Sequence, residues 1–259
     1  MLTFDNKIIL NPAGMNFLQH LGNYTTLIKA SFARPEKGNV YWKLIAEEVE
    51  KMGLGSVGIV VFVAFFFGAV IAIQTANNMD NPLLPEMLIG LGTRDSVILE
   101  FSSTIMCLIL AGKVGSNIAS EIGSMKVTQQ IDALETMGVN SAGYVIFPKI
   151  VAAVFIFPFL SLCYMFVGIF GGWVGVVVTG VINSSQFIYG LHYGFKSYYI
   201  VYTLTKTVVF AFIISSVSSY YGYNTELGSK AVGDASTKAV VNSSLIILIF
   251  NLLLTKLML

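Results

Sequence analysis

The sequence predicts an all-α integral membrane protein, with an N-terminal interfacial amphipathic helix followed by about five transmembrane helices. Of its 259 residues, 55% are hydrophobic and 11% are charged, whereas soluble domains carry about 25% charged residues. Long apolar stretches without acidic or basic residues alternate with short polar connections. A formal net charge of only +1 argues against a nucleic-acid-binding protein. The length suits one membrane domain and leaves no room for a separate nucleotide-hydrolysing domain.

Residues 1–51 are the polar part of the chain, interpreted as a cytoplasmic or interfacial segment before a membrane domain of residues 52–259. Asn11-Pro12 is typical of a helix start and Pro35 of a helix end. Between them, apolar residues recur on one helical face: Phe17, Leu21, Tyr24, Ile28 and Phe32. Ahead of a membrane span, this stripe favours a helix lying in the interface plane. The alternative is a helix packed on a soluble partner.

The first two spans are expected at about 54–77 and 96–119. The first lies in a charge-free stretch from Met52 to Met79, which is longer than the ~30 Å hydrocarbon core requires. After the second, the chain turns polar but still favours a helix, and we expect a short amphipathic helix at 121–138. Its apolar residues recur about every third position: Ile122, Met125, Ile131, Leu134 and Met137. Gly138 follows as a typical left-handed stop.

The last three spans are expected at about 150–181, 198–220 and 240–259. No Asp, Glu, Lys or Arg occurs from Ile150 to Phe195, so one long span and a hairpin of two are both open. Because Asn183-Ser184-Ser185 is the clearest break, we interpret 150–181 as one long, tilted span. Whether 183–196 forms a short helix stays open. Glycine pairs four residues apart, 168/172 and 171/175, are typical of helix-packing surfaces.

The distribution of basic residues predicts a cytoplasmic N-terminus, because cytoplasmic segments are enriched in Lys and Arg. In that topology the outside keeps only Arg94, Lys196 and Lys256, and the connections 121–138 and 221–239 are cytoplasmic. This pattern fits a multi-pass protein of the bacterial inner membrane.

Patterns typical of catalysis or metal binding are missing from the sequence. It lacks the phosphate-binding loop GxxxxGK[ST] and the nucleophile elbow GxSxG. Its two histidines and two cysteines have no ligand spacing. We therefore expect no catalytic residues, no metal site and no enzymatic activity in this chain.

Two charges inside predicted spans are candidate binding residues. Glu100 lies in the first turns of the second span, and Lys206 lies near the middle of the fourth, where a charge costs at least ~2.5 kcal/mol. They could form a polar lining for the head group of an amphiphilic substrate. Alternatively, they could form a Lys–Glu ion pair, or the lysine could extend to water.

The run AGKVGSNIASEIGSMKVTQQIDALETMGV (Ala111–Val139) closely resembles the hallmark segment of the MlaE/YrbE permeases, the membrane subunits of MCE-associated ABC transporters. The segments Tyr220–Ser244 and Phe65–Gln74 are similar to that family's last cytoplasmic loop and first span. The resemblance implies an MlaE-like ABC permease fold. It also implies a function in moving phospholipids or related hydrophobic molecules between the inner membrane and the outer envelope.

The partners that this resemblance implies are a second copy of the chain, a cytoplasmic ABC ATPase, a periplasmic hexamer of MCE-domain protein and the phospholipid. A small regulatory subunit could join them. ATP and Mg²⁺ would bind on the ATPase, and this chain would carry no cofactor. The segment matching 121–138 is the family's coupling helix, and its candidate docking residues are Glu121, Met125, Gln130, Ile131, Asp132, Leu134 and Glu135.

For the substrate, the resemblance implies a lipid cavity near Glu100, with Gln74 in the matching part of the first span and Lys206 matching a lysine of the fourth. Family members commonly read Arg-Glu-Leu-Gly-Pro around the glutamate, whereas this chain has Leu99-Glu100-Phe101-Ser102-Ser103. The missing arginine argues against a bidentate grip on phosphate there. The alternative function is a stand-alone secondary transporter or channel that uses Glu100 and Lys206 as a relay. A purely structural membrane scaffold is a third alternative.

Overall fold

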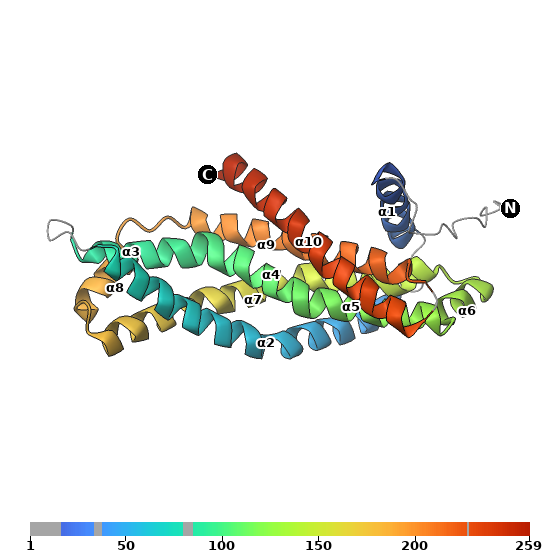
Figure 1. Cartoon of the computed structure of the whole chain (residues 1–259), viewed down its shortest axis with the longest axis horizontal. Helices are drawn as coiled ribbons and strands as arrows, with labels where there is room; N and C mark the ends of the chain where they lie inside the picture. Colours follow the sequence, from blue (N-terminus) through green and yellow to red (C-terminus); the bar gives the residue numbers. More distant parts are fainter. Residues whose placement is uncertain (1–16, 34–37, 80–84, 227) are drawn as a thin grey trace.

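The computed structural model describes residues 17–33, 38–79, 85–226 and 228–259, and every regular element in them is helical. Five helices are long and apolar enough to cross a membrane, and they run side by side in an elongated bundle (Figure 1). The predicted all-α class with five spans is therefore confirmed. The expected helix signals Asn11-Pro12 and Pro35 lie outside the described residues.

The elements follow one another in a simple order. The first three are α1 (Phe17–Phe32), α2 (Gly38–Asn77) and α3 (Met87–Ser96). The second membrane helix continues through a π-helical segment η2 (Val97–Ile105), α4 (Met106–Leu110), a second π-helical segment η3 (Ala111–Gly115) and α5 (Ser116–Val127). The rest comprises α6 (Gln130–Thr136), α7 (Ser141–Thr179), α8 (Ser184–His192), α9 (Tyr198–Tyr223) and α10 (Ser229–Met258).

Helix α1 lies against its own bundle near the end that carries α6 (Figure 1). The hydroxyl of Tyr24 donates to Ser216 Oγ at 2.8 Å, and Phe32 packs edge-on against Phe147. Burial raises the pKa of Tyr24, which keeps its hydroxyl protonated as the donor. The Asn140 amide donates to the carbonyl oxygens of Ala30 and Ala33 and its oxygen caps α7, so one side chain joins the end of α1 to the start of α7.

Several membrane helices begin earlier than the sequence analysis expected. Helix α2 starts at Gly38 rather than near residue 54, because residues 43–51 are good helix formers despite their charge. The boundary between residues 51 and 52 thus falls inside a continuous helix. The third span starts at Ser141 rather than 150 because Asn140 caps it.

The second membrane helix starts at Met87 rather than Ser96, since Arg94 is compatible with burial. Its guanidinium donates to the carbonyl oxygens of Leu191 and Tyr193 at 2.9 and 2.8 Å and pairs with Asp95 at 2.8 Å. These bonds satisfy an arginine that is 3% exposed and attach the last turn of α8 and the residue after it to α3.

The long apolar stretch after Ile150 forms one span, as interpreted. Helix α7 is a single helix of 39 residues, and Gly180 ends it with a positive φ of 65°. The short helix α8 follows, capped by the Asn183 side chain, which accepts from Ser185 N at 3.2 Å. Of the two possibilities left open for 150–195, the structure has the single span.

Both expected cytoplasmic connections need correction. The segment 121–138 is two helices, α5 and α6, separated by a turn in which Gln129 has a φ of 59°. The Thr128 and Gln129 amides donate to the carbonyl oxygens of Ser124 and Lys126 at the end of α5, and the positive φ of Gln129 then turns the chain into α6. Segment 221–239 is mostly helix, because α10 already begins at Ser229. Gly138, with a φ of 78°, ends α6 as predicted.

The closest helix contact joins α2 to α7 through glycines. A Cβ on Gly68 would lie 1.8 Å from the carbonyl oxygen of Gly168, and one on Gly171 would lie 2.2 Å from the carbonyl oxygen of Phe65. The backbones touch because no side chain separates them, which is how helices associate in lipid. The packing interpretation of the glycine pairs in α7 is confirmed.

We predict that Gly68→Ala lowers the free energy of unfolding by about 1–3 kcal/mol or more, because the new methyl group meets backbone rather than a side chain that can move. Gly58→Ala in the same helix is the matched control, since a Cβ there meets nothing within 4 Å. Thermal denaturation of both variants in detergent, followed by size-exclusion chromatography, measures the difference. Equal midpoints would contradict the proposed contact.

Candidate functional site

The two candidate intramembrane charges form an ion pair. Lys206 Nζ on α9 lies 3.0 Å from Glu100 Oε1 on η2, so the pairing alternative from the sequence analysis is what the structure has. The lysine side chain is fully buried, whereas 40% of the glutamate side chain is exposed. Glu100 is therefore the charged group that a ligand can reach.

Polar groups from three membrane helices surround this pair. Lys206 Nζ also donates to the hydroxyls of Tyr202 at 3.0 Å and Thr255 at 3.4 Å. The second carboxylate oxygen, Glu100 Oε2, accepts from Thr104 Oγ1 at 3.0 Å and from Asn251 Nδ2 at 3.2 Å. We call these six residues the polar cluster. Its members from α10, Asn251 and Thr255, were missed because no sequence pattern relates them to Glu100.

The π-helical winding of η2 explains how the cluster fits. Widened turns leave backbone carbonyl groups without their usual partners. Thr203 Oγ1 on α9 donates to the carbonyl oxygen of Ile98 at 2.7 Å, and Lys206 Nζ lies 3.5 Å from that of Leu99. Helix α9 therefore supplies donors both to the carboxylate and to the backbone beside it.

Gln74, the third candidate, is not a member of the cluster. It lies near the end of α2 with an exposed side chain, and it forms no side-chain hydrogen bond with the residues that the structure describes. The structure therefore brings together two of the three candidate substrate residues. Within the described ranges, no group of three or more His, Cys, Asp or Glu side chains could hold a metal ion.

A second charged network lies at the α6 end of the bundle. Lys149 on α7 is 3% exposed and pairs with Glu48 on α2 at 2.5 Å and with Glu121 on α5 at 3.0 Å. Lys51 on α2 also pairs with Glu121, at 2.5 Å. We call these four residues the charge network. It joins three membrane helices beside the α5–α6 turn. Lys149 and Glu48 were not candidates from sequence because they lie 101 positions apart and meet only in the fold.

The candidate coupling residues divide into an inner and an outer group. Ile131 is fully buried and Met125 and Leu134 pack against the same core, so the chain itself covers the apolar side of α6. The outward-facing candidates are Gln130, Asp132 and Glu135. Met137, which the sequence analysis did not select, is 70% exposed.

Hydrogen bonds and an ion pair hold α6 against its neighbours. Asp132 pairs with Lys126 across the turn at 2.7 Å. Glu135 Oε1 accepts from the hydroxyls of Ser141 at 2.8 Å and Tyr223 at 2.9 Å. Helix α6 is thus fastened to the start of α7 and the end of α9, and a force on it would reach both.

Comparison with known proteins supports one family. The model of the family described as "Permease MlaE" matches residues 45–257. A "Probable ABC transporter permease protein" of Rickettsia bellii is 36% identical, over 92% of this chain and 92% of its own length. The "Intermembrane phospholipid transport system permease protein MlaE" of Haemophilus influenzae is 28% identical, over 94% of each chain. The chloroplastic protein TRIGALACTOSYLDIACYLGLYCEROL 1 of Arabidopsis thaliana is 29% identical, over 85% of this chain and 62% of its own.

We predict that Lys149→Met lowers the free energy of unfolding by about 2 kcal/mol or more, because it leaves Glu48 without a cation and Glu121 with only Lys51. The loss should stay below the ~3–5 kcal/mol of a fully buried pair, since both carboxylates keep some contact with water. Lys43→Met is the matched control: Lys43 is 81% exposed and only 4.0 Å from Glu47, so its loss should cost at most about 0.5 kcal/mol. Chemical denaturation in detergent compares the two, and equal losses would argue against the network.

Proposed function

This chain belongs to the MlaE permease family of ABC transporters. On that premise we propose that it moves phospholipid between the inner membrane and the outer envelope, driven by ATP hydrolysis in a separate ATPase. The chain is a multi-pass membrane protein. In this proposal ATP and Mg²⁺ bind on the ATPase, while the permease provides the lipid site and the surface that receives the conformational signal.

The polar cluster is the observation that carries the proposal. A half-exposed carboxylate among apolar membrane helices must be held by specific donors, because charges inside the membrane are costly. Lys206 is saturated by its own chain, so it fixes Glu100 rather than binding ligand. The group left for a ligand is an anion, which favours the ammonium or hydroxyl donors of a phospholipid head group over its phosphate.

The outer face of α6 supports the second part of the proposal. We assign the contact with the ATPase to the exposed residues Gln130, Asp132, Glu135 and Met137. Ile131 and Leu134 hold the helix on the bundle, and Glu121 holds α5 to α2 and α7. Closure of the ATPase would thereby shift the populations of two arrangements of the membrane helices.

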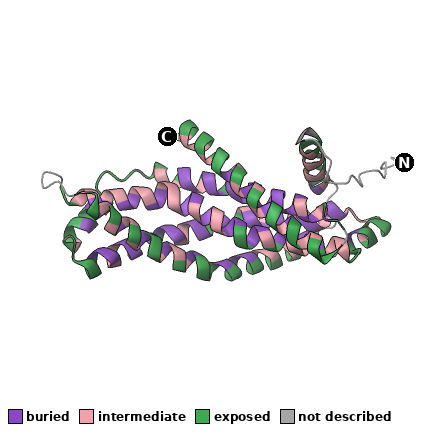
Figure 2. Ribbon diagram, viewed as in Figure 1, coloured by how far each residue is buried: buried purple, intermediate pink, exposed green. Residues whose placement is uncertain are grey.

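The remaining partners complete the proposal. Helix α10 is the least buried of the five spans, and exposed residues are frequent in its C-terminal half (Figure 2). We assign this face to a second copy of the chain, forming a homodimer in the membrane. A periplasmic hexamer of MCE-domain protein would receive the lipid at the opposite end from α6, and a small regulatory subunit would act through the ATPase.

Affinity purification of the full chain from native membranes in mild detergent tests the proposal, with lipid mass spectrometry and an ATPase assay on the eluate. We expect a co-purifying ATPase and bound phospholipid. A chain that purifies alone, without nucleotidase activity, would instead favour a secondary transporter in which Glu100 and Lys206 act as a relay.

We predict that Glu100→Gln lowers the affinity of the purified protein for phospholipid about tenfold or more, since a charge-assisted hydrogen bond contributes ~1.5–3 kcal/mol. Glu86→Gln, the same change at an exposed position near the start of α3, should leave the affinity unchanged. A double variant, Glu100→Leu with Lys206→Met, should recover the stability that Lys206→Met alone loses but should not recover lipid binding. Unchanged lipid binding in Glu100→Gln would show that the polar cluster does not bind phospholipid.

We also predict that Met137→Glu weakens the association with the ATPase about tenfold or more while the permease stays folded, because the change places a charge at an apolar contact. Tyr193→Glu, at an exposed position after α8, is the control at the opposite end of the bundle. Co-purification yield and ATPase stimulation measure the effect. Normal yield from Met137→Glu would show that the ATPase contacts another surface.

A further inference from the structure

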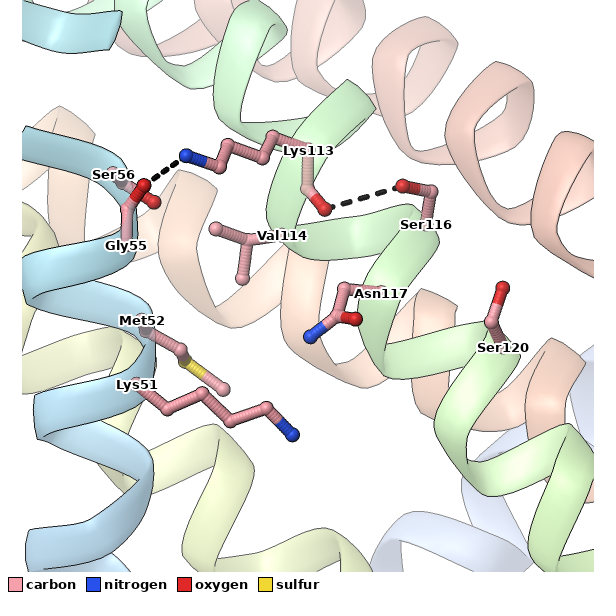
Figure 3. A pocket seen from close by; sticks show the side chains of 9 residues that line it. All are labelled: Lys51, Met52, Gly55, Ser56, Lys113, Val114, Ser116, Asn117 and Ser120. Atoms are coloured by element: carbon pink, nitrogen blue, oxygen red, sulfur yellow. Dashed lines mark hydrogen bonds between the residues drawn. The ribbon is translucent and has the colours of Figure 1, made fainter. Parts of the chain in front are cut away.

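A cavity of about 450 Å³ opens between α2 and the second membrane helix, apart from the polar cluster. One wall consists of Lys51, Met52, Gly55 and Ser56, and the other of Lys113, Val114, Ser116, Asn117 and Ser120 (Figure 3). Lysines therefore flank it from both sides, and most of its other lining groups are small or polar.

The depth of the cavity is set by the sequence of α2. Lys51 is the last charged residue before the apolar stretch that begins at Met52, and Gly55 is one turn further along. The cavity therefore lies where the charged surface of the protein gives way to its hydrocarbon-facing surface, at the α6 end. With the orientation that the basic residues predict, this is the head-group level of the cytoplasmic leaflet.

The charges around the cavity leave one cation uncompensated. Lys51 and Lys149 are balanced by Glu48 and Glu121 in the charge network. Lys113 has no carboxylate partner among the described residues, and its ammonium group contacts only the carbonyl oxygen of Gly55 (Figure 3). Since an ammonium has three donors, two remain for a ligand.

Other polar groups in the cavity could contribute hydrogen bonds to a ligand beside Lys113. The Asn117 amide and the Ser120 hydroxyl form no side-chain hydrogen bond with the part of the chain that is described, and both belong to the wall that carries Lys113. Gly55 leaves the opposite wall open, because a Cβ there would meet nothing within 4 Å. The space can thus admit a small anion next to the lysine, with the amide and the hydroxyl further along the same wall.

Nearby side chains restrict the kind of anion. Glu47 and Glu50 line an adjoining depression with Lys51, so a polyanion extending from the cavity would meet like charge. On the membrane side, the same face of α2 continues with exposed Ile59, Phe62 and Phe66. A molecule with a single negative charge and a long apolar tail satisfies both conditions.

We propose that this cavity binds the phosphodiester of a phospholipid in the cytoplasmic leaflet, with Lys113 as the charged contact and the exposed face of α2 along the acyl chains. Basic pockets between membrane helices on the cytoplasmic side are known to bind lipid head groups in this way. The site lies beyond the function proposed above, and binding there requires neither transport nor the ATPase.

Native mass spectrometry of the full chain in detergent, titrated with phosphatidylglycerol, tests this site. Lys113→Gln should weaken phosphatidylglycerol binding about fivefold, the loss expected for one basic residue near an anionic lipid. Lys113→Arg should retain the affinity, and Gly55→Leu should reduce it by filling the cavity without changing charge. Lys43→Gln, on the same helix but 81% exposed, should bind as the unchanged chain does.

Two further ligands identify the source of the anion. Diacylglycerol lacks the phosphate and should not distinguish Lys113→Gln from the unchanged chain, whereas inorganic phosphate should fail to displace phosphatidylglycerol at millimolar concentration. Equal phosphatidylglycerol affinity in Lys113→Gln and in the unchanged chain would overturn the proposal. Full displacement of phosphatidylglycerol by inorganic phosphate would overturn it as well. In a Glu100→Gln background, where binding at the polar cluster is already weakened, Lys113→Gln should still lower the affinity for phosphatidylglycerol about fivefold, which separates the two sites.

Discussion

The backbone contact between α2 and α7 is the constraint on which the rest of the bundle depends. Apolar side chains gain no hydrophobic free energy when they leave lipid for a protein interior, so the association of membrane helices depends strongly on close packing. Glycines at Gly68, Gly168 and Gly171 supply that fit. This pair forms a frame for the other helices: α1 and α9 pack on α7, and α3 packs on α2. The charge network has members on both helices of this frame, and η2 and α9, which carry most of the polar cluster, pack on α7.

Within the bundle, buried charges occur in groups that neutralise themselves at three depths. Lys206 balances Glu100 inside the span, Lys149 and Lys51 balance Glu48 and Glu121 at the α6 end, and Arg94 balances Asp95 near α8. In each group a cation is buried while a carboxylate keeps some exposure. The protein can therefore present acidic groups at controlled positions while its own cations hold them. Lys113 is exposed and, unlike these cations, has no carboxylate partner among the described residues, and this distinguishes the cavity beside it.

Much of the fold could be predicted because hydrophobic length is a local property. The five spans, the single long span after Ile150 and the stop at Gly138 all follow from sequence composition and helix termination. Helix starts could not be predicted in the same way, because polar residues such as Arg94 and Asn140 gain partners far along the chain. The pair Glu100–Lys206 was among the alternatives from sequence, but Asn251, Thr255 and Lys149 join their clusters only through tertiary packing. Ile131 shows the opposite limit: its apolar character was recognised, but not that its own chain would cover it.

The two π-helical segments make the second membrane helix sensitive to its exact length in residues. Glu100 lies in one and Lys113 in the other, and each segment accommodates its residues in turns wider than those of an α-helix. Removing one residue from either segment would allow ordinary α-helical winding to return with little rotation of the helix beyond it, because a π-helical turn holds about one residue more than an α-helical turn. In η2, the carbonyl groups of Ile98 and Leu99 would then regain partners inside the helix and compete with Thr203 and Lys206 for them. A single in-frame codon deletion could therefore weaken the polar cluster while the faces of the second membrane helix stayed in place.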